Sequence, residues 1–195
     1  MNRQITFQQY RSIDLTIMAV LLAISQFVIY FASSVLYPEQ LYVVSPAAAL
    51  TAIVMMRWNG WAAIHAVLSG VLYALLAGGT AQHFVIYGAG NVASLLALLV
   101  LKGFGKERVR MDGILSGVFG LSAQALMWLG RAGIAFLLGF SPAACLGFIT
   151  TDILSGLFTL VIIWVVRRVE GLFEDQKHYL LRLESERQVE GREKF

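Results

Sequence analysis

The sequence predicts an all-α integral membrane protein with six transmembrane helices, both chain ends in the cytoplasm, and a cytoplasmic amphipathic helix after the last span. Of its 195 residues, 58% are hydrophobic and 14% charged, and its mean hydropathy is +0.71. Soluble domains are about 45–50% apolar. The apolar residues gather in six runs, and most basic residues fall on one side if each run crosses once. We expect a transmembrane domain over residues 1–168 and a charged cytoplasmic tail over residues 169–195.

Six apolar runs follow one another along the chain. A full span needs about 20 residues, with a range of about 17–25. The second run is short and contains Pro46, which suits the first turn of a helix. This run is therefore expected to tilt, or to start as irregular backbone before the proline. The runs are Ile13–Leu36, Leu41–Met56, Trp61–Ala77, Phe84–Leu101, Gly113–Leu138 and Pro142–Val166.

The Lys and Arg residues predict the orientation. Fourteen of the fifteen precede the first run, separate the second run from the third and the fourth from the fifth, or follow the sixth. The other three connections, at residues 37–40, 78–83 and 139–141, contain neither Lys nor Arg. Short cytoplasmic loops are enriched in these residues. Both ends are therefore predicted to be cytoplasmic, in a multi-pass protein of the cell membrane.

The tail from Glu170 has apolar residues at a helical spacing. This pattern fits an amphipathic helix that lies along the membrane or against a partner. The alternative is a solvated helix that frays after its last apolar residue. The apolar residues are Leu172, Phe173, Tyr179, Leu180 and Leu183.

Several classes of function are disfavoured. The net charge of +3 comes from short loops between spans, so it does not indicate nucleic-acid binding. Cys145 is the only cysteine and the three histidines are scattered, so neither a metal site nor a cofactor is expected. The chain has no HExxH or GxSxG motif. We therefore do not expect an enzyme.

Polar residues in the last three runs fall on common helical faces. Residues three, four or seven apart stack on one side of a helix. Such stripes should avoid lipid, where polar groups go unsatisfied, and three facing stripes could line one cavity. The stripes are His83, Tyr87 and Asn91, then Gln124, Trp128 and Arg131, then Asp152, Ser155 and Thr159.

Arg131 and Asp152 are predicted to lie at similar depths, nearer the outer face. Arg131 lies nine residues before the turn near Phe140 and Asp152 twelve after it, so at the helical rise their depths differ by roughly 4–5 Å. An Arg within a span costs about 2.5–3.5 kcal/mol on insertion scales. Two explanations stay open. Arg131 binds a carboxylate, phosphate or carbonyl group of a ligand, or it pairs with Asp152 and fastens two helices together. The two explanations are compatible if the Arg131–Asp152 pair separates when a ligand binds.

The predicted ligand site contains the other members of these stripes near the same depth. Asn91 would contact the ligand or join helices, and Trp128 would stack on a flat ring or pack in the core. The predicted substrate-binding residues from the stripes are Arg131, Asn91, Trp128, Tyr87, Asp152 and Gln124.

The whole-chain pattern resembles the substrate-binding S-components of energy-coupling factor (ECF) vitamin transporters, over roughly Asp14–Arg168. Those proteins are of about this size, with six helices and both ends inside. Three stretches carry the resemblance: LTIMAVLLAIS in the first run, RWNGWAAIHAVLSGVLYALLAGG leading through the third, and VIYGAGNVASLLALLVLKG in the fourth.

The resemblance implies a subunit without enzymatic activity that captures a vitamin-like molecule near the outer face. Its partners would be a transmembrane coupling subunit and two ATPase subunits. Alanines four apart on the first helix dock the coupling subunit in that family, and Ala19 and Ala23 match two such positions, although they could serve internal packing. The first outer loop, Tyr37 to Ser45, would act as a lid with Tyr42 as its ligand contact.

Two other classes of function stay open from the sequence. One is a small membrane-embedded enzyme that uses Asp152, Arg131 and His83. The other is a stand-alone carrier or structural membrane protein. Turnover would distinguish the enzyme, and uptake without a partner ATPase would distinguish the carrier.

Overall fold

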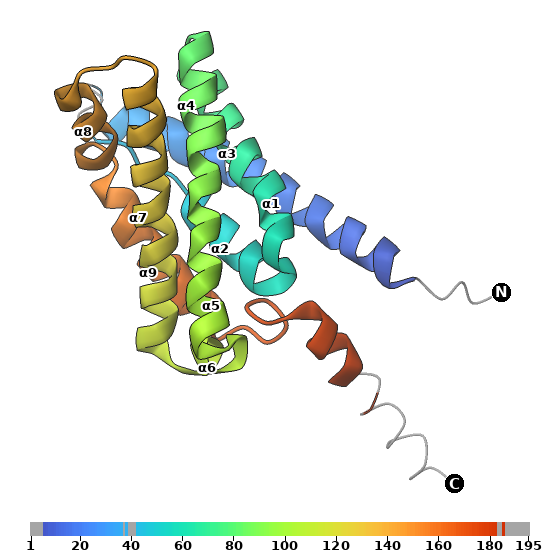
Figure 1. The fold of residues 1–195 in the computed structure, drawn as a ribbon. Coiled ribbons are helices and arrows are strands. Elements are labelled where there is room, and N and C mark those ends of the chain that lie inside the picture. Colours follow the sequence, from blue (N-terminus) through green and yellow to red (C-terminus); the bar gives the residue numbers. More distant parts are fainter. Residues whose placement is uncertain (1–5, 37, 39–41, 183–184, 186–195) are drawn as a thin grey trace, which may run out of the picture.

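The computed structural model describes residues 6–36, 38, 42–182 and 185, and the secondary structure of this part is helical, without strands. Figure 1 shows the helices packed side by side as a bundle, with α1 leaning across it. The elements are α1 (Phe7–Leu36), α2 (Ala47–Trp58), the 3₁₀ turn η1 (Asn59–Trp61), α3 (Ala62–Leu76), α4 (Ala81–Val92), the 3₁₀ stretch η2 (Ala93–Ala97), α5 (Leu98–Phe104), α6 (Lys106–Met111), α7 (Gly113–Leu137), α8 (Pro142–Thr150) and α9 (Ile153–Val166).

Five helical stretches among the described residues are long and apolar enough to cross a membrane. The protein is therefore an all-α protein with the character of a membrane protein, as its composition predicts. The number of complete crossings and their orientation stay predictions. The five stretches are Phe7–Leu36, Ala47–Leu76, Ala81–Phe104, Gly113–Leu137 and Pro142–Val166.

The second stretch contains the second and third predicted runs, and it turns back on itself. Asn59 has a φ of 53°, which ends α2, and α3 then packs against α2. The 12 residues of α2 rise only about 18 Å, less than the hydrocarbon thickness of about 30 Å. The preceding residues 42–46 are not helical. The prediction that the second run begins as irregular backbone is confirmed.

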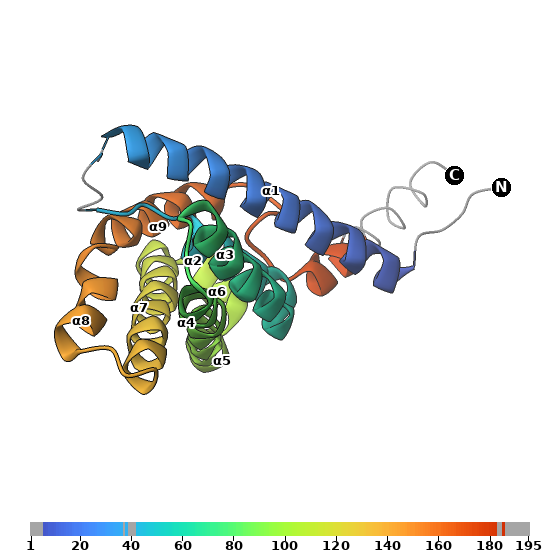
Figure 2. The ribbon, with the colours of Figure 1, turned by 90° about the horizontal axis from the view of Figure 1, so that it is seen from above.

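Helix α2 lies in the middle of the bundle. All its residues except Leu50 are buried. Figure 2 shows α2 surrounded by α1, α3, α4, α7 and α9. A helix that is apolar on every side is stable only when enclosed, and the sequence AAALTAIVMM has this character. The centre of the protein is therefore a short, buried helix.

Helix α1 lies on the outside of the bundle (Figure 2). Its buried residues are Met18, Leu22 and Gln26, four apart, which form one narrow seam. Ala19 and Ala23 beside this seam are half-buried. Most large apolar side chains on the remaining faces of α1 are exposed. This helix has the surface that lipid or another membrane protein would cover.

Glycines bring α4 into backbone contact with both of its neighbours. A Cβ atom on Gly70 of α3 would lie 2.2 Å from the carbonyl oxygen of Tyr87, and one on Gly130 of α7 would lie 2.1 Å from that of Gly90. Only glycine fits at such distances. Close packing at these two points places Asn91 and Arg131, the residues next to Gly90 and Gly130, against each other.

The sixth predicted run is interrupted, whereas the sequence pattern indicated one continuous helix. Helix α8 ends at Thr150 and α9 begins at Ile153, so Asp152 lies in the break. The fourth run also changes, from α-helix to the 3₁₀ stretch η2. The apolar pattern does not reveal such breaks, because hydropathy and helical periodicity indicate which faces are apolar and not where the backbone hydrogen bonds of a helix are interrupted.

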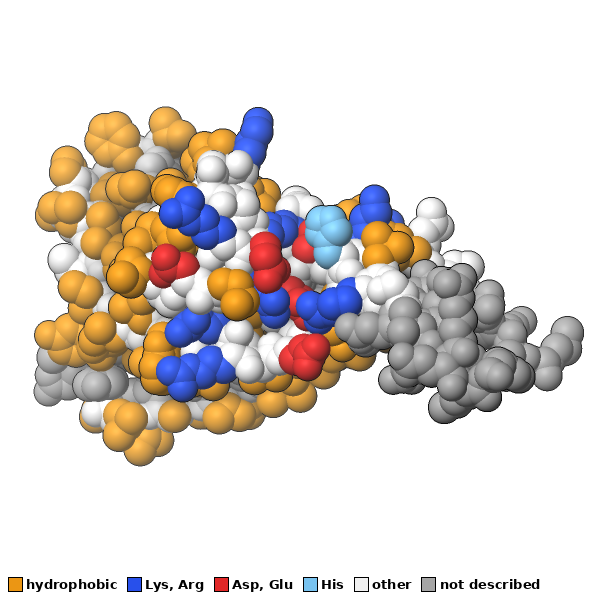
Figure 3. Space-filling view, turned by 90° about the horizontal axis from the view of Figure 1, so that it is seen from below, with side chains coloured by type: hydrophobic (Ala, Val, Ile, Leu, Met, Phe, Trp, Pro, Cys, Tyr) orange, Lys and Arg blue, Asp and Glu red, His pale blue; other side chains and the backbone are white. Residues whose placement is uncertain are grey.

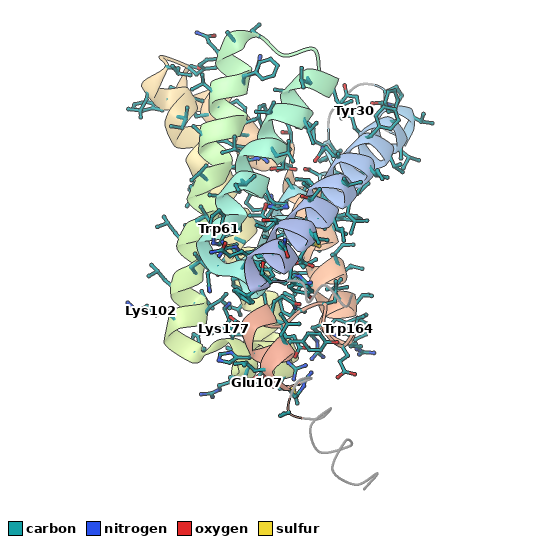
Figure 4. The ribbon with its side chains drawn as sticks, turned by 90° about the vertical axis from the view of Figure 1, so that its right-hand side faces the viewer. Tyr30, Trp61, Lys102, Glu107, Trp164 and Lys177 are labelled. Atoms are coloured by element: carbon teal, nitrogen blue, oxygen red, sulfur yellow. The ribbon has the colours of Figure 1, made fainter. Side chains whose placement is uncertain are left out.

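Charged side chains gather at one end of the bundle, which we call the charged end. Figure 3 views this end and shows Lys, Arg, Asp and Glu in its centre with hydrophobic side chains around much of its margin. Figure 4 shows Lys102, Glu107 and Lys177 at this end and Tyr30 toward the opposite end. Two further basic residues lie over indole rings, with Arg11 4.4 Å from Trp61 and Arg168 3.8 Å from Trp164. Such pairs are typical of a membrane interface.

The first part of the tail packs into the charged end. Phe173 is fully buried against Phe119, and Gln176 accepts a hydrogen bond from the Tyr10 hydroxyl at 2.9 Å. Residues 176–182 are helical, and Leu183 of the predicted amphipathic pattern lies outside the described residues. The tail is therefore neither wholly solvated nor wholly along the membrane, since Phe173 belongs to the core of the bundle.

Ion pairs hold this segment in place. Lys106 contacts Asp175 at 2.6 Å, and Arg57 contacts Asp14 at 2.5 Å while donating to the carbonyl oxygens of Gly171 and Leu172. Burial lowers the pKa of Lys106, although Asp175 acts in the opposite direction. Burial by itself would raise the pKa of Asp175, but the hydrogen bond and charge of Lys106 outweigh it and lower that pKa. The contact with Lys106 thus favours the charged form of Asp175.

Candidate functional site

Arg131 and Asp152 form an ion pair, as one of the two explanations left open by the sequence requires. Arg131 Nη1 lies 2.7 Å from Asp152 Oδ2, and their side chains are only 5% and 4% exposed. Arg131 comes from α7 and Asp152 from the break before α9. A buried ion pair forms only if further hydrogen bonds compensate for the loss of water around both charges. The surrounding residues supply these bonds.

The carboxylate of Asp152 accepts hydrogen bonds from three further side chains. Trp128 Nε1 and Gln124 Nε2 both donate to Oδ2, at 3.0 and 3.3 Å. The Ser155 hydroxyl donates to Oδ1. Gln124 also accepts from Thr159 at 3.1 Å. The predicted stripes on α7 and α9 therefore face each other and meet at Asp152.

The guanidinium of Arg131 connects this cluster to α4 and α3. Its Nε donates to Asn91 Oδ1 at 2.7 Å, and Asn91 Nδ2 donates to Ser69 Oγ at 2.9 Å. The guanidinium carbon lies 5.0 Å from the centre of the Tyr87 ring. Six of the seven residues predicted to bind a ligand therefore belong to one cluster. They are the ion pair Arg131 and Asp152 and the four residues around it, Asn91, Trp128, Tyr87 and Gln124.

Arg131 retains hydrogen-bonding capacity. A guanidinium has five N–H donors, and among the described residues it has three acceptors: Asn91, Asp152 and the sulfur of Met127, 3.1 Å from Nη2. A thioether sulfur is a weak acceptor. The Nη2 group can therefore donate strongly to an oxygen atom of another molecule that comes within reach.

The irregular segment 42–46 covers this cluster. The Val43 N–H donates to the Thr151 carbonyl oxygen at 2.8 Å, and the Ser45 N–H donates to Ser155 Oγ at 2.8 Å. Ser45 Oγ donates to Gln26 Oε1 at 3.2 Å. Non-helical backbone at membrane depth is stable only when protein or a water-filled cavity satisfies its polar groups. Here the α8–α9 break and α9 satisfy them.

Two small cavities lie on either side of this segment. The inner one, about 10 Å³, reaches Arg131 and Asp152, and the outer one, about 40 Å³, reaches Tyr42. About one water molecule fits into the inner cavity, whereas sites for drug-sized ligands measure about 300–1,000 Å³. This conformation of the site is closed. Both cavities are lined by Val43 and Tyr73, which separate them.

Aromatic side chains form the outer wall of the inner cavity. The ring centres of Tyr73 and Tyr87 lie 4.7 Å apart. Tyr87 and Phe148 pack edge to face, with their ring centres 5.7 Å apart. Tyr30 of α1 adds a third contact, 6.2 Å from Tyr73. The polar pair therefore has flat apolar surfaces beside it. A molecule with a planar ring and an anionic or carbonyl group would match both parts.

Five residues of the network were missing from the sequence-predicted site. Ser155 and Thr159 were on a predicted stripe, and Ser69 lies on the face of α3 that meets Asn91. Gln26 is buried on the inner seam of α1, and Ser45 precedes Pro46 in the irregular segment. A polar residue aligned with Met18 and Leu22 was the available signal for Gln26. Ser69 lies on a polar stripe of the third run with His65 and Tyr73, whereas nothing local distinguishes Ser45 from other serines.

The remaining predicted residues lie elsewhere. Tyr42 is exposed and lines the outer cavity, while Tyr37 and residues 39–41 of the predicted lid lie outside the described residues. His83 accepts at Nδ1 from the Thr80 N–H at 3.1 Å, which caps α4. His83 is therefore not a partner of Asp152. The described residues contain no group of three or more His, Cys, Asp and Glu able to hold a metal.

A much larger cavity lies at the charged end, and Arg131 is not among its lining residues. It measures about 680 Å³ and lies between α6 and the tail. Its acidic residues Glu107, Glu174 and Asp175 are all paired with Lys or Arg. Size alone does not make this cavity the binding site, since its charges already satisfy one another.

Comparison of the chain with models of protein families, with curated proteins and with solved structures found no match.

Proposed function

We propose that this protein is a membrane-embedded capture subunit for a vitamin-like small molecule, of the kind that S-components provide to ECF importers. The observation that carries the proposal is the Arg131 guanidinium. It is buried beside a small cavity, has donors without strong acceptors among the described residues, and lies under a non-helical cover. A purely structural arginine would be expected to use its donors fully within the protein.

The chemistry of the site indicates the type of ligand. Arg131 Nη2 would receive a carboxylate, phosphate or carbonyl oxygen, and Tyr73, Tyr87 or Phe148 would lie against a flat ring. Because the inner cavity has room for about one water, the cover formed by segment 42–46 must move to admit this ligand. No catalytic step is required for such capture and release.

The proposal includes partners. The exposed face of α1 and the half-buried Ala19 and Ala23 would dock a transmembrane coupling subunit that works with two cytoplasmic ATPase subunits. The charged end would then face the cytoplasm and the Arg131 site would open to the outside. This part is supported by the position of α1 at the margin of the bundle and by the narrowness of the seam that it buries there.

Native mass spectrometry of the protein, purified in mild detergent from its own host, tests the function. The informative variant is Arg131→Gln combined with Asp152→Asn, because it removes the guanidinium without leaving a buried charge. We expect a small molecule bound to the wild type and lost in the double variant, with the fold preserved. Co-purifying ATPase subunits would support the partners.

Other outcomes would contradict the proposal. A bound molecule retained equally by the double variant would place the ligand elsewhere. Conversion of the bound molecule to a product, with dependence on Asp152, would indicate a membrane enzyme instead. Uptake by the protein in vesicles without any ATPase would indicate a stand-alone carrier.

A further inference from the structure

Two interruptions of helical structure meet beside Arg131. Segment 42–46 separates α1 from α2, and Thr151 with Asp152 separates α8 from α9. The two are joined directly, because the Val43 N–H donates to the Thr151 carbonyl oxygen at 2.8 Å. Each interruption therefore stabilises the other, and movement of one changes the hydrogen bonding of the other.

Ser155 lies where these interruptions meet the ion pair. Its Oγ accepts from the Ser45 N–H at 2.8 Å and is also 3.3 Å from the Val43 carbonyl oxygen. The same hydroxyl donates to Asp152. A serine hydroxyl has one proton, so Asp152 and Val43 compete for it, and the charged carboxylate is the stronger acceptor. The hydrogen bond from Ser155 to the Val43 carbonyl oxygen therefore depends on whether Asp152 accepts the hydroxyl proton.

Helix α8 buries fewer of its residues than its neighbours α7 and α9. Cys145 is its only buried residue, whereas α7 buries eight residues and α9 buries four. Phe148 of α8 contacts Tyr87 and lines the inner cavity. Segment 42–46 and α8 together therefore form the outer cover of Arg131, and elements with few buried contacts open most readily.

We propose that Ser155 is a positioning residue that holds this cover closed and couples it to the Arg131–Asp152 pair. The segment and α8 move as one unit when the Ser155 contacts break. This inference rests on the proposed function for its biological meaning, since the cover controls access of the captured molecule to Arg131. Its geometry can be tested without any ligand.

The test measures how readily the cover opens. Val44→Cys is introduced into the covering segment in a Cys145→Ala background, and its alkylation by a membrane-impermeant maleimide is followed in lipid nanodiscs. Ser155→Ala leaves the Ser45 N–H without an acceptor, so we expect alkylation about tenfold faster. The rate reports the open population as long as reclosing is faster than alkylation.

Thr159→Val is the matched control. Thr159 is fully buried one turn further along α9, and its hydroxyl bonds Gln124 rather than the cover. Its removal should change the rate at Val44→Cys less than twofold. A cysteine at Gln82, which is exposed in the first turn of α4, reports general access to the same end and should react equally in all backgrounds.

The proposal fails if Ser155→Ala and Thr159→Val have the same effect, or if Ser155→Ala also accelerates the reaction at position 82. Amide hydrogen exchange of the wild-type protein gives a second measurement. It tests the proposal even if the Ser155→Ala variant does not fold. Residues 42–46 and 142–152 should open with one common free energy, and separate values would overturn the joint movement. These readouts involve no ligand, so a failure of the proposed function alone leaves them unchanged.

Discussion

At the scale of the residue, Arg131 and Asp152 decide the character of the site. A buried ion pair is weak evidence for stability, because apolar residues of similar volume often do as well. Loss of one partner is costly, because it leaves the other charge buried. The two explanations of Arg131, structural pairing and ligand binding, therefore predict different results when both charges are removed together.

We expect Arg131→Ala alone to destabilise the protein by about 3–5 kcal/mol, because it leaves Asp152 without its cation. The double variant Arg131→Met with Asp152→Leu should be within about 1–2 kcal/mol of the wild type. Reversible unfolding in mixed detergent micelles measures both. A double variant as unstable as the single one would show that the pair is retained for stability and weaken the ligand-binding interpretation.

At the scale of the element, the approach of α7 to α4 positions the site. Gly130 faces the backbone of α4, whereas Gly133, one turn further along, has no atom within 4 Å of an added Cβ. The same helix thus offers one glycine that is required for packing and one that is not. Asn91 and Arg131 lie next to the required contact, so its geometry controls their hydrogen bond.

Gly130→Ala should destabilise the protein by at least about 1–3 kcal/mol, the usual cost of overpacking, and should disturb the Arg131–Asn91 contact. Gly133→Ala should be neutral or stabilising by up to about 1 kcal/mol, because alanine favours a helix more than glycine. Thermal unfolding of the two variants in the same detergent provides the comparison. Equal behaviour of the two would mean that α4 and α7 are not in backbone contact.

At the scale of the whole molecule, the distribution of charge gives the expected orientation. The charged end contains the ion pairs of the docked tail, while the connection at residues 78–83, which lacks Lys and Arg, is predicted to lie on the opposite side of the membrane. The positive-inside rule places the charged end in the cytoplasm. The proposed capture of an external molecule requires this orientation.

In intact cells carrying the Cys145→Ala background, a cysteine at Gln82 should react with a membrane-impermeant maleimide. A cysteine at Lys102 should react only after permeabilisation. Reaction of both positions, or the reverse order, would contradict the predicted orientation. The wild-type level of protein in the membrane must be retained for the comparison to be valid.

Much of the candidate site could be predicted from sequence, because polar residues in an apolar run must face inward. This rule selected Asn91, Gln124, Trp128, Arg131 and Asp152, all of which belong to one hydrogen-bonded network. The rule says nothing of partners, so it could not decide between ligand binding and pairing. Ser45, Ser69 and Gln26 needed the three-dimensional structure, since their bonds reach residues distant along the chain.

The sequence by itself determined the membrane character of the protein and which helical faces are polar, because hydropathy and helical periodicity are local properties. Tertiary structure decided three features: the enclosure of α2 by its neighbours, the break at Asp152, and the burial of Phe173 in the charged end. Each depends on backbone groups and side chains finding partners far along the chain. The closed cover over Arg131 follows from those same long-range bonds.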